Sequence, residues 1–367
     1  MIRVGIVGLG KMGLSHLAIF RAHPDVEVAG ICDSTGYLLS VLSKYTGVNT
    51  YPDLDSMLKE QQLDAVVIAT PSWLHAQMVR QCLSAGLHVF CEKPFCLDPV
   101  ESAELTALAE SRGLVTQVGY HYRYVGAFQE VKRLLEAGAI GNVTQVLAEA
   151  YGPVVLKPQG GTWRSRKNLG GGSLYDYAAH PLNLVNWYLG QPTAAAGTVL
   201  QPVFSAEIDD QVSATLRFDS GATAQLSVNW SDESERKMST KMTIWGTGGK
   251  IHADRQEVQA YLRDGSTAPA GYSKGWTVKN TTELTSEVWY YLRGEEYSSQ
   301  AADFVSRISA GRTDGVNSFA EASITDTSLA MLVADASGVT AVPTARPTPK
   351  RTLFRLGRSS HQRIGEA

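Results

Sequence analysis

A glycine-rich turn near the start of the chain, Gly8-Leu-Gly10-Lys11-Met12-Gly13, constrains the fold more than any other feature. The apolar stretch Ile2–Val7 before it predicts a buried strand, and Met12–Ala22 has the pattern of a helix. In such a strand–turn–helix unit, glycines permit a tight turn, close approach of a pyrophosphate to the backbone and close packing of helix on strand. The turn therefore predicts a dinucleotide-binding unit.

Short apolar runs alternate with helical patterns over the first third of the chain. The strands are continuously apolar, which indicates that both faces of their sheet are covered. We expect an α/β Rossmann domain with a mostly parallel sheet over residues 1–123. Further strands are predicted at Val26–Cys32, Ala65–Ala69, Leu87–Cys91 and Leu114–Tyr120, and further helices at Tyr37–Thr46, His75–Ala85 and Pro99–Ser111.

Strands with period-two alternation follow residue 124, which is typical of a sheet with one exposed face. We expect an α+β domain with a mainly antiparallel sheet over residues 124–341. Its predicted strands include Val143–Tyr151, Gln211–Phe218 and Ala222–Asn229, and its predicted helices are Ala127–Ala137, Glu295–Ala310 and Phe319–Gly338. Residues 342–367 combine prolines with arginines, and we expect a poorly ordered basic tail there.

Charge and composition argue against several classes of partner. A formal net charge of -3 gives no electrostatic basis for binding nucleic acid. No apolar run approaches the ~18 residues of a membrane-spanning helix, and no secretory leader is expected before the first predicted strand. The four cysteines lack metal-ligand spacing, so we expect reduced, structural thiols and no bound metal. The expected location is the cytoplasm.

Asp33 bears on the choice of dinucleotide. It follows the second predicted strand, about 20 residues after Gly13, where a carboxylate accepts hydrogen bonds from ribose hydroxyls and repels a 2′-phosphate. No Arg or Lys follows until Lys44. The sequence therefore favours NAD(H) over NADP(H), the alternative being that Asp33 only caps a loop after a strand.

Two further segments carry groups suited to proton transfer. Glu92-Lys93-Pro94 follows a predicted strand, at the carboxyl edge where open α/β sheets bind ligands. The glycines at 170–172 precede Asp176 and His180, which would share one face of a helix because they are four residues apart. Taken singly, Lys93 fits a solvated surface charge, and Asp176 with His180 fits a hydrogen-bonded pair.

Together these motifs resemble the family of glucose-fructose oxidoreductase, inositol dehydrogenase and the rhizopine-catabolism oxidoreductases. The resemblance extends to about Gly338 and implies a dinucleotide-binding domain followed by an α+β domain. It also implies a large open sheet used for oligomer contacts, and hence a homo-dimer or homo-tetramer. The motifs are the glycine turn, Ala69-Thr70-Pro71 with His75, Glu92-Lys93-Pro94, Val118–Tyr124, Trp163-Arg164, and the glycines at 170–172 with Asp176 and His180.

The resemblance implies a catalytic trio of Lys93, Asp176 and His180 in an NAD(H)-dependent oxidoreductase. The expected reaction moves a hydride between nicotinamide and a secondary hydroxyl or ketone of a sugar, a sugar derivative or a cyclic polyol. A neutral His180 would accept the hydroxyl proton, and Lys93 would stabilise negative charge on the same oxygen. Asp176 would bind a neighbouring hydroxyl or orient the imidazole.

Other candidates surround this trio. The candidate cofactor contacts are Gly8, Gly10, Lys11, Met12, Gly13, Asp33, Thr70, Pro71, His75, Glu92, Lys93 and Arg164. The candidate substrate contacts are Tyr120, His121, Arg123, Trp163 and Asn183. Arg123 and Arg164 are equally consistent with salt bridges, and Tyr120 and Trp163 with core packing. Pro181 directly follows His180, so the helix loses one backbone donor there.

Two alternatives to a dehydrogenase stay open. A member of the same family can hold NAD tightly, oxidise its substrate, eliminate and re-reduce, which gives net cleavage of a glycoside. A non-catalytic protein that binds NAD for regulation is the other alternative, although such a protein has no need for a proton-transfer group.

Overall fold

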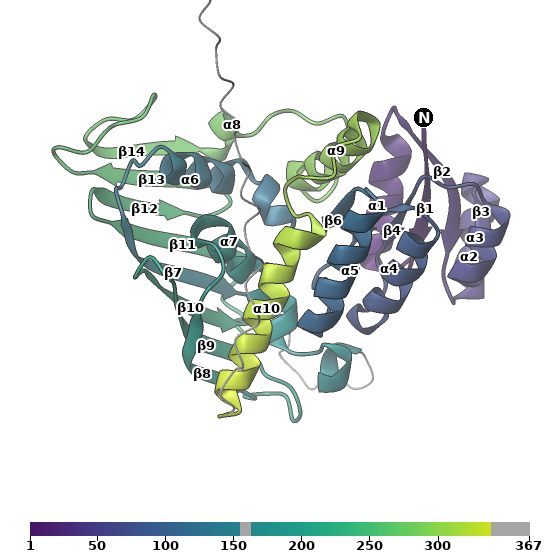
Figure 1. Cartoon of the computed structure of the whole chain (residues 1–367), viewed down its shortest axis with the longest axis horizontal. Coiled ribbons are helices and arrows are strands. Elements are labelled where there is room, and N and C mark those ends of the chain that lie inside the picture. Colours follow the sequence, from purple (N-terminus) through teal and green to yellow (C-terminus); the bar gives the residue numbers. More distant parts are fainter. Residues whose placement is uncertain (155–162, 339–367) are drawn as a thin grey trace, which may run out of the picture.

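The computed structural model describes residues 1–154 and 163–338. The basic tail expected over residues 342–367 lies outside this part of the chain. Two sheets lie side by side, with the six-stranded sheet of the N-terminal region at one end and a larger sheet at the other (Figure 1). Among the described residues, no helix is both long and apolar enough to cross a bilayer.

The first sheet is parallel throughout, with the strand order β3-β2-β1-β4-β5-β6. This order is that of a dinucleotide-binding Rossmann fold, and the expected α/β domain is confirmed. The strands are β1 (Ile2–Val7), β2 (Val26–Cys32), β3 (Asn49–Tyr51), β4 (Ala65–Ile68), β5 (His88–Cys91) and β6 (Thr116–Val118). The helices are α1 (Lys11–Ala22), α2 (Gly36–Thr46), α3 (Leu54–Glu60), α4 (His75–Ser84) and α5 (Pro99–Ser111).

Sequence analysis missed β3 and α3. The strand has three residues and the helix seven, so neither is long enough to establish a hydrophobic period. Asp53 begins α3 by accepting a hydrogen bond from the backbone N–H of Ser56, a capping signal that the sequence carries.

The second sheet has eight strands in the order β14-β13-β12-β11-β7-β10-β9-β8. Only β10 and β7 are parallel neighbours, so the expected mainly antiparallel sheet is confirmed. Helices α6 (Gly126–Glu136) and α7 (Ala179–Leu189) cover one face. The strands are β7 (Val143–Tyr151), β8 (Ala194–Gln201), β9 (Gln211–Arg217), β10 (Thr223–Asn229), β11 (Ser239–Gly246), β12 (Gly249–Ala253), β13 (Glu257–Leu262) and β14 (Gly275–Asn280).

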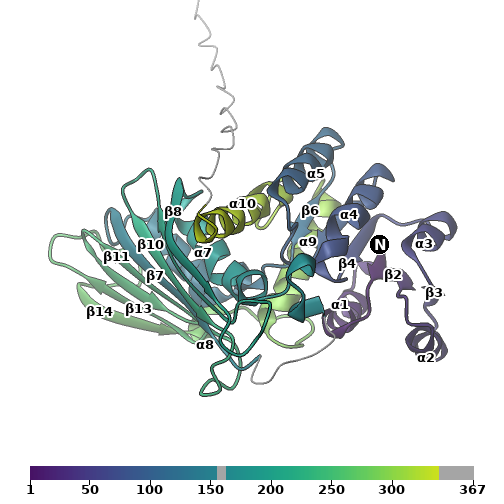
Figure 2. The ribbon, with the colours of Figure 1, turned by 90° about the horizontal axis from the view of Figure 1, so that it is seen from below.

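The chain returns to the first sheet after completing the second. After the short helix α8 (Thr281–Leu284), α9 (Glu295–Ala310) contributes Phe304 to the core of the Rossmann sheet. Helix α10 (Phe319–Ala336) then runs between the two parts of the molecule and packs on α5, α7 and β8 (Figure 2). These two helices therefore join the two sheets.

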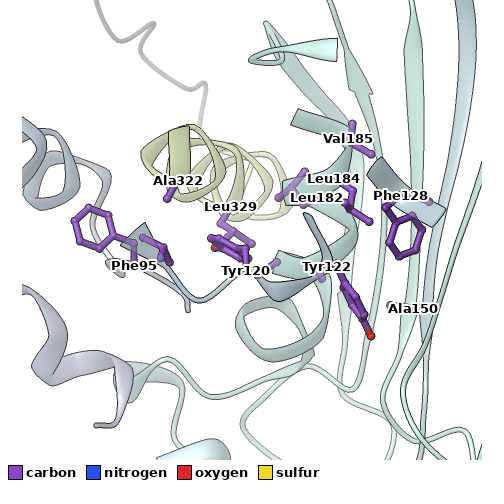
Figure 3. Close-up of a cluster of buried hydrophobic side chains, with 14 of the residues drawn as sticks. Phe95, Tyr120, Tyr122, Phe128, Ala150, Leu182, Leu184, Val185, Ala322 and Leu329 are labelled. Carbon is purple, nitrogen blue, oxygen red and sulfur yellow. The ribbon is translucent and has the colours of Figure 1, made fainter. Parts of the chain in front are cut away.

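A continuous apolar core fixes the junction between the two sheets. Figure 3 shows Tyr120 from the Rossmann side beside Leu329 of α10, with Leu182 of α7 beyond them. Phe95 stacks on Phe319 of α10, with ring centres 4.0 Å apart. Helix α7 is buried over most of its circumference, because nearly all of its residues are apolar or amide-bearing. Burying one such side chain contributes roughly 1.5–3 kcal/mol, so this core holds α7 firmly against α10 and the second sheet.

Candidate active site

The glycine turn has the geometry of a phosphate cradle. Gly8 has a φ of +85°, and a Cβ there would lie 2.9 Å from the carbonyl group of Ala69. A Cβ on Gly13 would lie 1.7 Å from the carbonyl oxygen of Gly8, so α1 packs too closely for any side chain. A Cβ on Gly10 meets nothing within 4 Å, and α1 begins at Lys11 without a side-chain cap. The free N–H groups of this helix end suit a pyrophosphate.

Asp33 is fixed beside the glycine turn. Its Oδ2 accepts a hydrogen bond from the backbone N–H of Leu9 at 2.6 Å, and its Oδ1 accepts one from Thr35 at 2.8 Å. The loop at Thr70 contacts the same turn, since a Cβ on Gly8 would lie 2.9 Å from the Thr70 methyl group. Asp33 thus has the local capping bonds that were its alternative, and its carboxylate lies at the candidate dinucleotide site.

Glu92 has a partner that sequence analysis missed. Its Oε1 lies 2.7 Å from Nε2 of the fully buried His16, one helical turn beyond the glycine turn, and its Oε2 accepts from the backbone N–H of Lys93 at 3.2 Å. Burial raises the pKa of Glu92, but the hydrogen bond and charge of His16, with the charge of Lys93, bring that pKa below its usual value. Glu92 therefore ties α1 to the turn that carries Lys93.

His75 is a positioning group, which corrects the expectation that it contacts the cofactor. Its Nδ1 lies 2.9 Å from the carbonyl oxygen of Pro94, and its Nε2 lies 3.0 Å from that of Thr70. The ring is fully buried, and burial lowers its pKa despite the two carbonyl groups. A neutral imidazole has one N–H, so His75 donates to one of these two carbonyl oxygens, and its fully buried ring has no exposed surface for a ligand.

Lys93 and Asp176 form an ion pair across the cleft between the domains. Lys93 Nζ donates to Asp176 Oδ1 and to the Asp176 carbonyl oxygen, both at 2.8 Å, and Arg164 Nε donates to Oδ2 at 3.2 Å. Burial raises the pKa of Asp176, but the charges of Lys93 and Arg164 lower it below its ordinary value. The carboxylate is therefore ionised and holds both cations in place.

His180 lies in a buried, aromatic part of the same cleft. Its ring is 5.0 Å from that of His121 and 5.1 Å from that of Tyr122, and its Nδ1 has no hydrogen-bond partner within residues 1–154 and 163–338. Burial, followed by the charge of Lys93, lowers its pKa well below the usual value. His180 is therefore neutral near pH 7 and can accept a proton.

The segment that carries Asp176 is a π-helical turn, Leu174–Ala178, rather than the start of one α-helix. Pro181 lacks the N–H that would continue the ladder, which accounts for a change of helix type here. Asp209 anchors the turn by accepting from Ser173 Oγ at 2.8 Å and from the backbone N–H of Leu174 at 2.7 Å. Asp176 and His180 still line the same cleft.

This cleft has a volume of about 500 Å³ and draws on both domains. The predicted residues that line it are Lys11, Met12, Glu92, Lys93, His121, Arg164, Asp176 and His180. Sequence analysis missed the lining residues Tyr122, Pro153, Val154, Tyr177, Arg236, Lys237, Met238, Arg255, Arg293 and Tyr297. The adjacent cations at 236 and 237, between two strands, were a usable signal.

The expected substrate contacts of Arg123 and Asn183 are corrected by the structure. Arg123 is 2% exposed, donates from Nε to Asn183 Oδ1 at 2.8 Å and pairs with Glu321 on α10. Its guanidinium stacks on Trp187, 5.4 Å from the ring centre. Each of the three guanidinium nitrogens of Arg123 donates to Asn183 on α7 or to Glu321 on α10. Arg123 therefore joins these two helices.

Tyr120 and Trp163 also lie outside the cleft lining. Tyr120 is 1% exposed and belongs to the core beside His180, with ring centres 6.3 Å apart (Figure 3). Trp163 lies under the guanidinium of Arg164 at 4.8 Å, on the short helix Trp163–Ser165. Tyr120 packs beside the lining residue His180, and Trp163 packs against the lining residue Arg164. Tyr120 therefore fits the core-packing alternative.

A parallel Rossmann sheet has a phosphate cradle and a fixed cation at its carboxyl edge, and α7 brings a neutral imidazole to the same cleft. This arrangement is that of a dinucleotide-dependent oxidoreductase. Comparison with known proteins agrees. Residues 2–120 match the model of an oxidoreductase family with an NAD-binding Rossmann fold, and residues 128–252 match the C-terminal domain of the same family, which takes in glucose-fructose oxidoreductase, inositol dehydrogenase and MocA.

Individual relatives are similar over most of the chain. The chain is 27% identical over 293 residues to 2,7-anhydro-N-acetylneuraminate hydratase of Escherichia coli (strain K12), which covers 77% of this chain and 74% of the relative. It is 30% identical over 257 residues to dTDP-3,4-didehydro-2,6-dideoxy-alpha-D-glucose 3-reductase of Streptomyces violaceoruber, covering 69% and 73%. The structure of levoglucosan dehydrogenase with NADH and levoglucosan matches with a TM-score of 0.80 and 23% identity over 92% of this chain and 97% of that chain, which shows a shared fold.

The chain belongs to this oxidoreductase family with an NAD-binding Rossmann fold. The predicted family, the oxidoreductase class and NAD as the cofactor are confirmed.

Proposed function

We propose that the chain catalyses reversible hydride transfer between NAD(H) and a secondary hydroxyl or ketone of a sugar, a sugar derivative or a cyclic polyol. The observation that carries the proposal is one cleft in which Lys93, paired with Asp176, lies with a neutral His180. The same cleft reaches Lys11 and Met12 of the glycine turn. A proton acceptor, a fixed cation and a dinucleotide cradle are the parts that alcohol oxidation requires.

His180, Lys93 and Asp176 have different roles at the reacting oxygen. Bound NAD(H) supplies the hydride acceptor or donor. In oxidation His180 accepts the hydroxyl proton, and in reduction it returns that proton. An ammonium group has three donors, and Asp176 takes two from Lys93, so one remains for the substrate oxygen. Asp176 thereby fixes Lys93 where negative charge develops.

The names of similar proteins support a carbohydrate substrate. Their names refer to an anhydro sugar acid, to a nucleotide-linked deoxysugar and to levoglucosan. The cleft suits such molecules, since its volume of about 500 Å³ lies in the range for small-ligand sites. It also combines carboxylates and cations with the rings of Tyr122 and Tyr297.

Asp33 supports NAD(H) over NADP(H). Its two carboxylate oxygens each accept one backbone N–H, which leaves lone pairs for ribose hydroxyls. A 2′-phosphate beside this carboxylate would be repelled, and residues 34–43 contain no Lys or Arg to compensate.

A second candidate function is net cleavage or hydration of a glycoside with NAD recycled in each turnover. It is favoured by the relative that is named a hydratase. The same His180 and Lys93 would serve the transient oxidation. Product formation without accumulation of NADH distinguishes this candidate from a dehydrogenase, and NADH binding without any turnover would leave the regulatory alternative.

The exposed face of the second sheet supports a homo-dimer or homo-tetramer. Trp276 pairs with Tyr261 across β14 and β13, with ring centres 5.4 Å apart, and Val278 lies two residues along the same face. All three side chains are exposed. Such a patch marks an interaction surface. Light scattering should give a multiple of 39.7 kDa, and a single-chain mass contradicts this part of the proposal.

The central experiment is a substrate panel of inositols, aldoses, sugar acids and nucleotide sugars, followed at the NADH absorbance band with NAD and with NADP. Lys93→Met should reduce kcat for any substrate found by at least about 10²-fold, because an electrostatic stabiliser of this kind contributes that much. Lys132→Met, on α6 outside the cleft, is the matched control. Turnover by Lys93→Met equal to that of the wild type contradicts the proposed site.

A further inference from the structure

The cleft has a strong excess of positive charge. Seven Lys and Arg side chains line it, against the carboxylates of Glu92 and Asp176. The chain as a whole has a formal net charge of -3, so the excess is a property of the cleft and not of the protein's composition. A concave site lined by one sign of charge concentrates ions of the opposite sign.

Several of these cations already have an assigned partner of opposite charge. Lys93 and Arg164 share Asp176, at 2.8 and 3.2 Å, and Arg255 pairs with the buried Glu296. Lys11 lies in the glycine turn, where the cofactor's pyrophosphate is expected. These four therefore have counter-charges before any substrate enters.

Three further lining cations have no such partner among the described residues. Arg236 and Lys237 lie in the connection between β10 and β11, and Arg293 lies just before α9. Within the described ranges 1–154 and 163–338, none of the three has an ion pair with a carboxylate. All three are exposed, so their charges are available to a ligand in the cleft.

Two acidic residues next to Arg236 and Lys237 in the sequence are engaged elsewhere. In the β10–β11 connection, Glu235 pairs with Lys241 at 3.7 Å, and Asp232 accepts from the hydroxyl of Ser234 at 2.6 Å. Arg293 has a φ of +70°, which is uncommon for a residue with a side chain, and its guanidinium lies 5.4 Å from the ring centre of the buried Tyr297. The backbone and this ring together place the Arg293 charge at the cleft.

We propose that the substrate carries an anionic group, a carboxylate or a phosphate, and that Arg236, Lys237 and Arg293 bind it. The inference rests on the proposed function, because the reacting carbon is placed at Lys93 and His180. Arginine suits either anion through paired N–H donors, and lysine adds a point charge. These three side chains thus select acidic or phosphorylated carbohydrates over neutral ones.

The test compares matched neutral and anionic carbohydrates on the NAD-loaded full chain. D-Glucose is compared with D-glucuronate, glucose 6-phosphate and UDP-glucose, each as a substrate and as a ligand titrated by calorimetry. The anionic members should have kcat/KM at least about tenfold above glucose. A larger gain for D-glucuronate would identify the bound group as a carboxylate, and a larger gain for glucose 6-phosphate or UDP-glucose would identify it as a phosphate.

The double variant Arg236→Gln/Lys237→Gln should raise KM for the preferred anion at least about tenfold and change kcat far less, because neither side chain is assigned to the reacting oxygen. The ratio of kcat/KM for the anion to kcat/KM for glucose should therefore fall at least about tenfold. The control Lys274→Gln/Arg312→Gln removes two exposed charges outside the cleft and should change nothing. Arg293→Gln should repeat the effect of the cleft pair.

The outcomes separate this inference from the function on which it rests. Equal turnover of neutral and anionic members, unchanged by the cleft variants, overturns the inference and leaves the dehydrogenase standing. If no member is turned over, the proposed function fails for this panel and calorimetry decides the inference. Tight binding of an anionic member that the double variant abolishes then supports it, and no difference from glucose overturns it.

Discussion

The two walls of the cleft are built in different ways. On the Rossmann side, Glu92 is bonded to His16, and His75 bridges two loops. These groups are buried, and each has a defined protein partner. On the opposite side, Arg236 and Lys237 project from a connection between strands and are exposed. One wall is held by buried polar bonds, whereas the other is bounded by side chains that reach into solvent.

The difference indicates how this fold separates reaction from recognition. Groups that must stay within hydrogen-bond distance of a reacting atom benefit from a wall that cannot move, because catalysis depends on preorganised dipoles. Groups that only select a substrate can sit on a loop and change without disturbing the core. The same reaction can therefore be retained while the recognised molecule differs.

The largest expected effect is on the chemistry of the cleft, from His180→Asn on α7. The substitution keeps a polar side chain but removes the proton acceptor, so kcat should fall by about 10²–10⁴-fold. Steady-state rates on a substrate identified in the panel measure this, with NADH binding and circular dichroism as checks of folding. A kcat for His180→Asn within tenfold of the wild-type value would show that His180 is not the general base.

The sequence predicted best those helices and strands whose hydrophobic or capping pattern was long or strong. The strand, glycine turn and helix at Ile2–Ala22 were predictable because each part has one strong physical reason. The helix Pro99–Ser111 agrees to the residue with α5, because Asp98 caps it and Pro99 occupies its first position. The return of α9 to the first sheet could not be predicted, since helical periodicity shows which face is apolar but not which sheet it meets.

For the candidate site, residues fixed by local motifs were easier to find than residues fixed by tertiary contacts. Lys93, Asp176 and His180 were found, and the structure brings them to one cleft. Arg123 was assigned to substrate because its segment matched a motif, yet its partners Asn183 and Glu321 lie on helices distant in the sequence. Only the fold could show that Arg123 is a buried clamp.

The next effect tests how firmly the Rossmann-side wall is held. His16→Ala leaves the Glu92 carboxylate buried without its partner, which should lower the free energy of unfolding by roughly 3–5 kcal/mol. Urea unfolding measures the loss. The double variant His16→Ala/Glu92→Gln removes the unpaired buried charge as well. Its loss in free energy of unfolding should therefore be smaller than the sum of the losses of the two single variants. Additive losses would mean that His16 and Glu92 do not act as a pair.

A smaller effect should appear as a pH dependence of stability. Burial, and then the charge of Arg255, lowers the pKa of His121 to about 3. The unfolded chain takes up a proton near pH 6.5, whereas the folded chain stays neutral until much lower pH. This contribution is therefore complete above about pH 6.5 and is lost as the pH falls towards 3, at about 1.4 kcal/mol per pH unit. Urea unfolding of His121→Phe between pH 7 and 5 should show a shallower decline, and parallel declines would contradict the assignment.

The smallest effect is expected on the opposite wall, and it decides whether the two walls truly differ. Arg236→Gln/Lys237→Gln removes exposed side chains without a carboxylate partner in the described part of the chain, so the free energy of unfolding should change by less than about 0.5 kcal/mol. Urea unfolding beside His16→Ala gives the comparison directly. A loss of several kcal/mol would mean that this wall is also part of the folded framework, because its cations would then be holding protein and not awaiting a ligand. A negligible change leaves the wall free to vary, which is what a surface devoted to recognition requires.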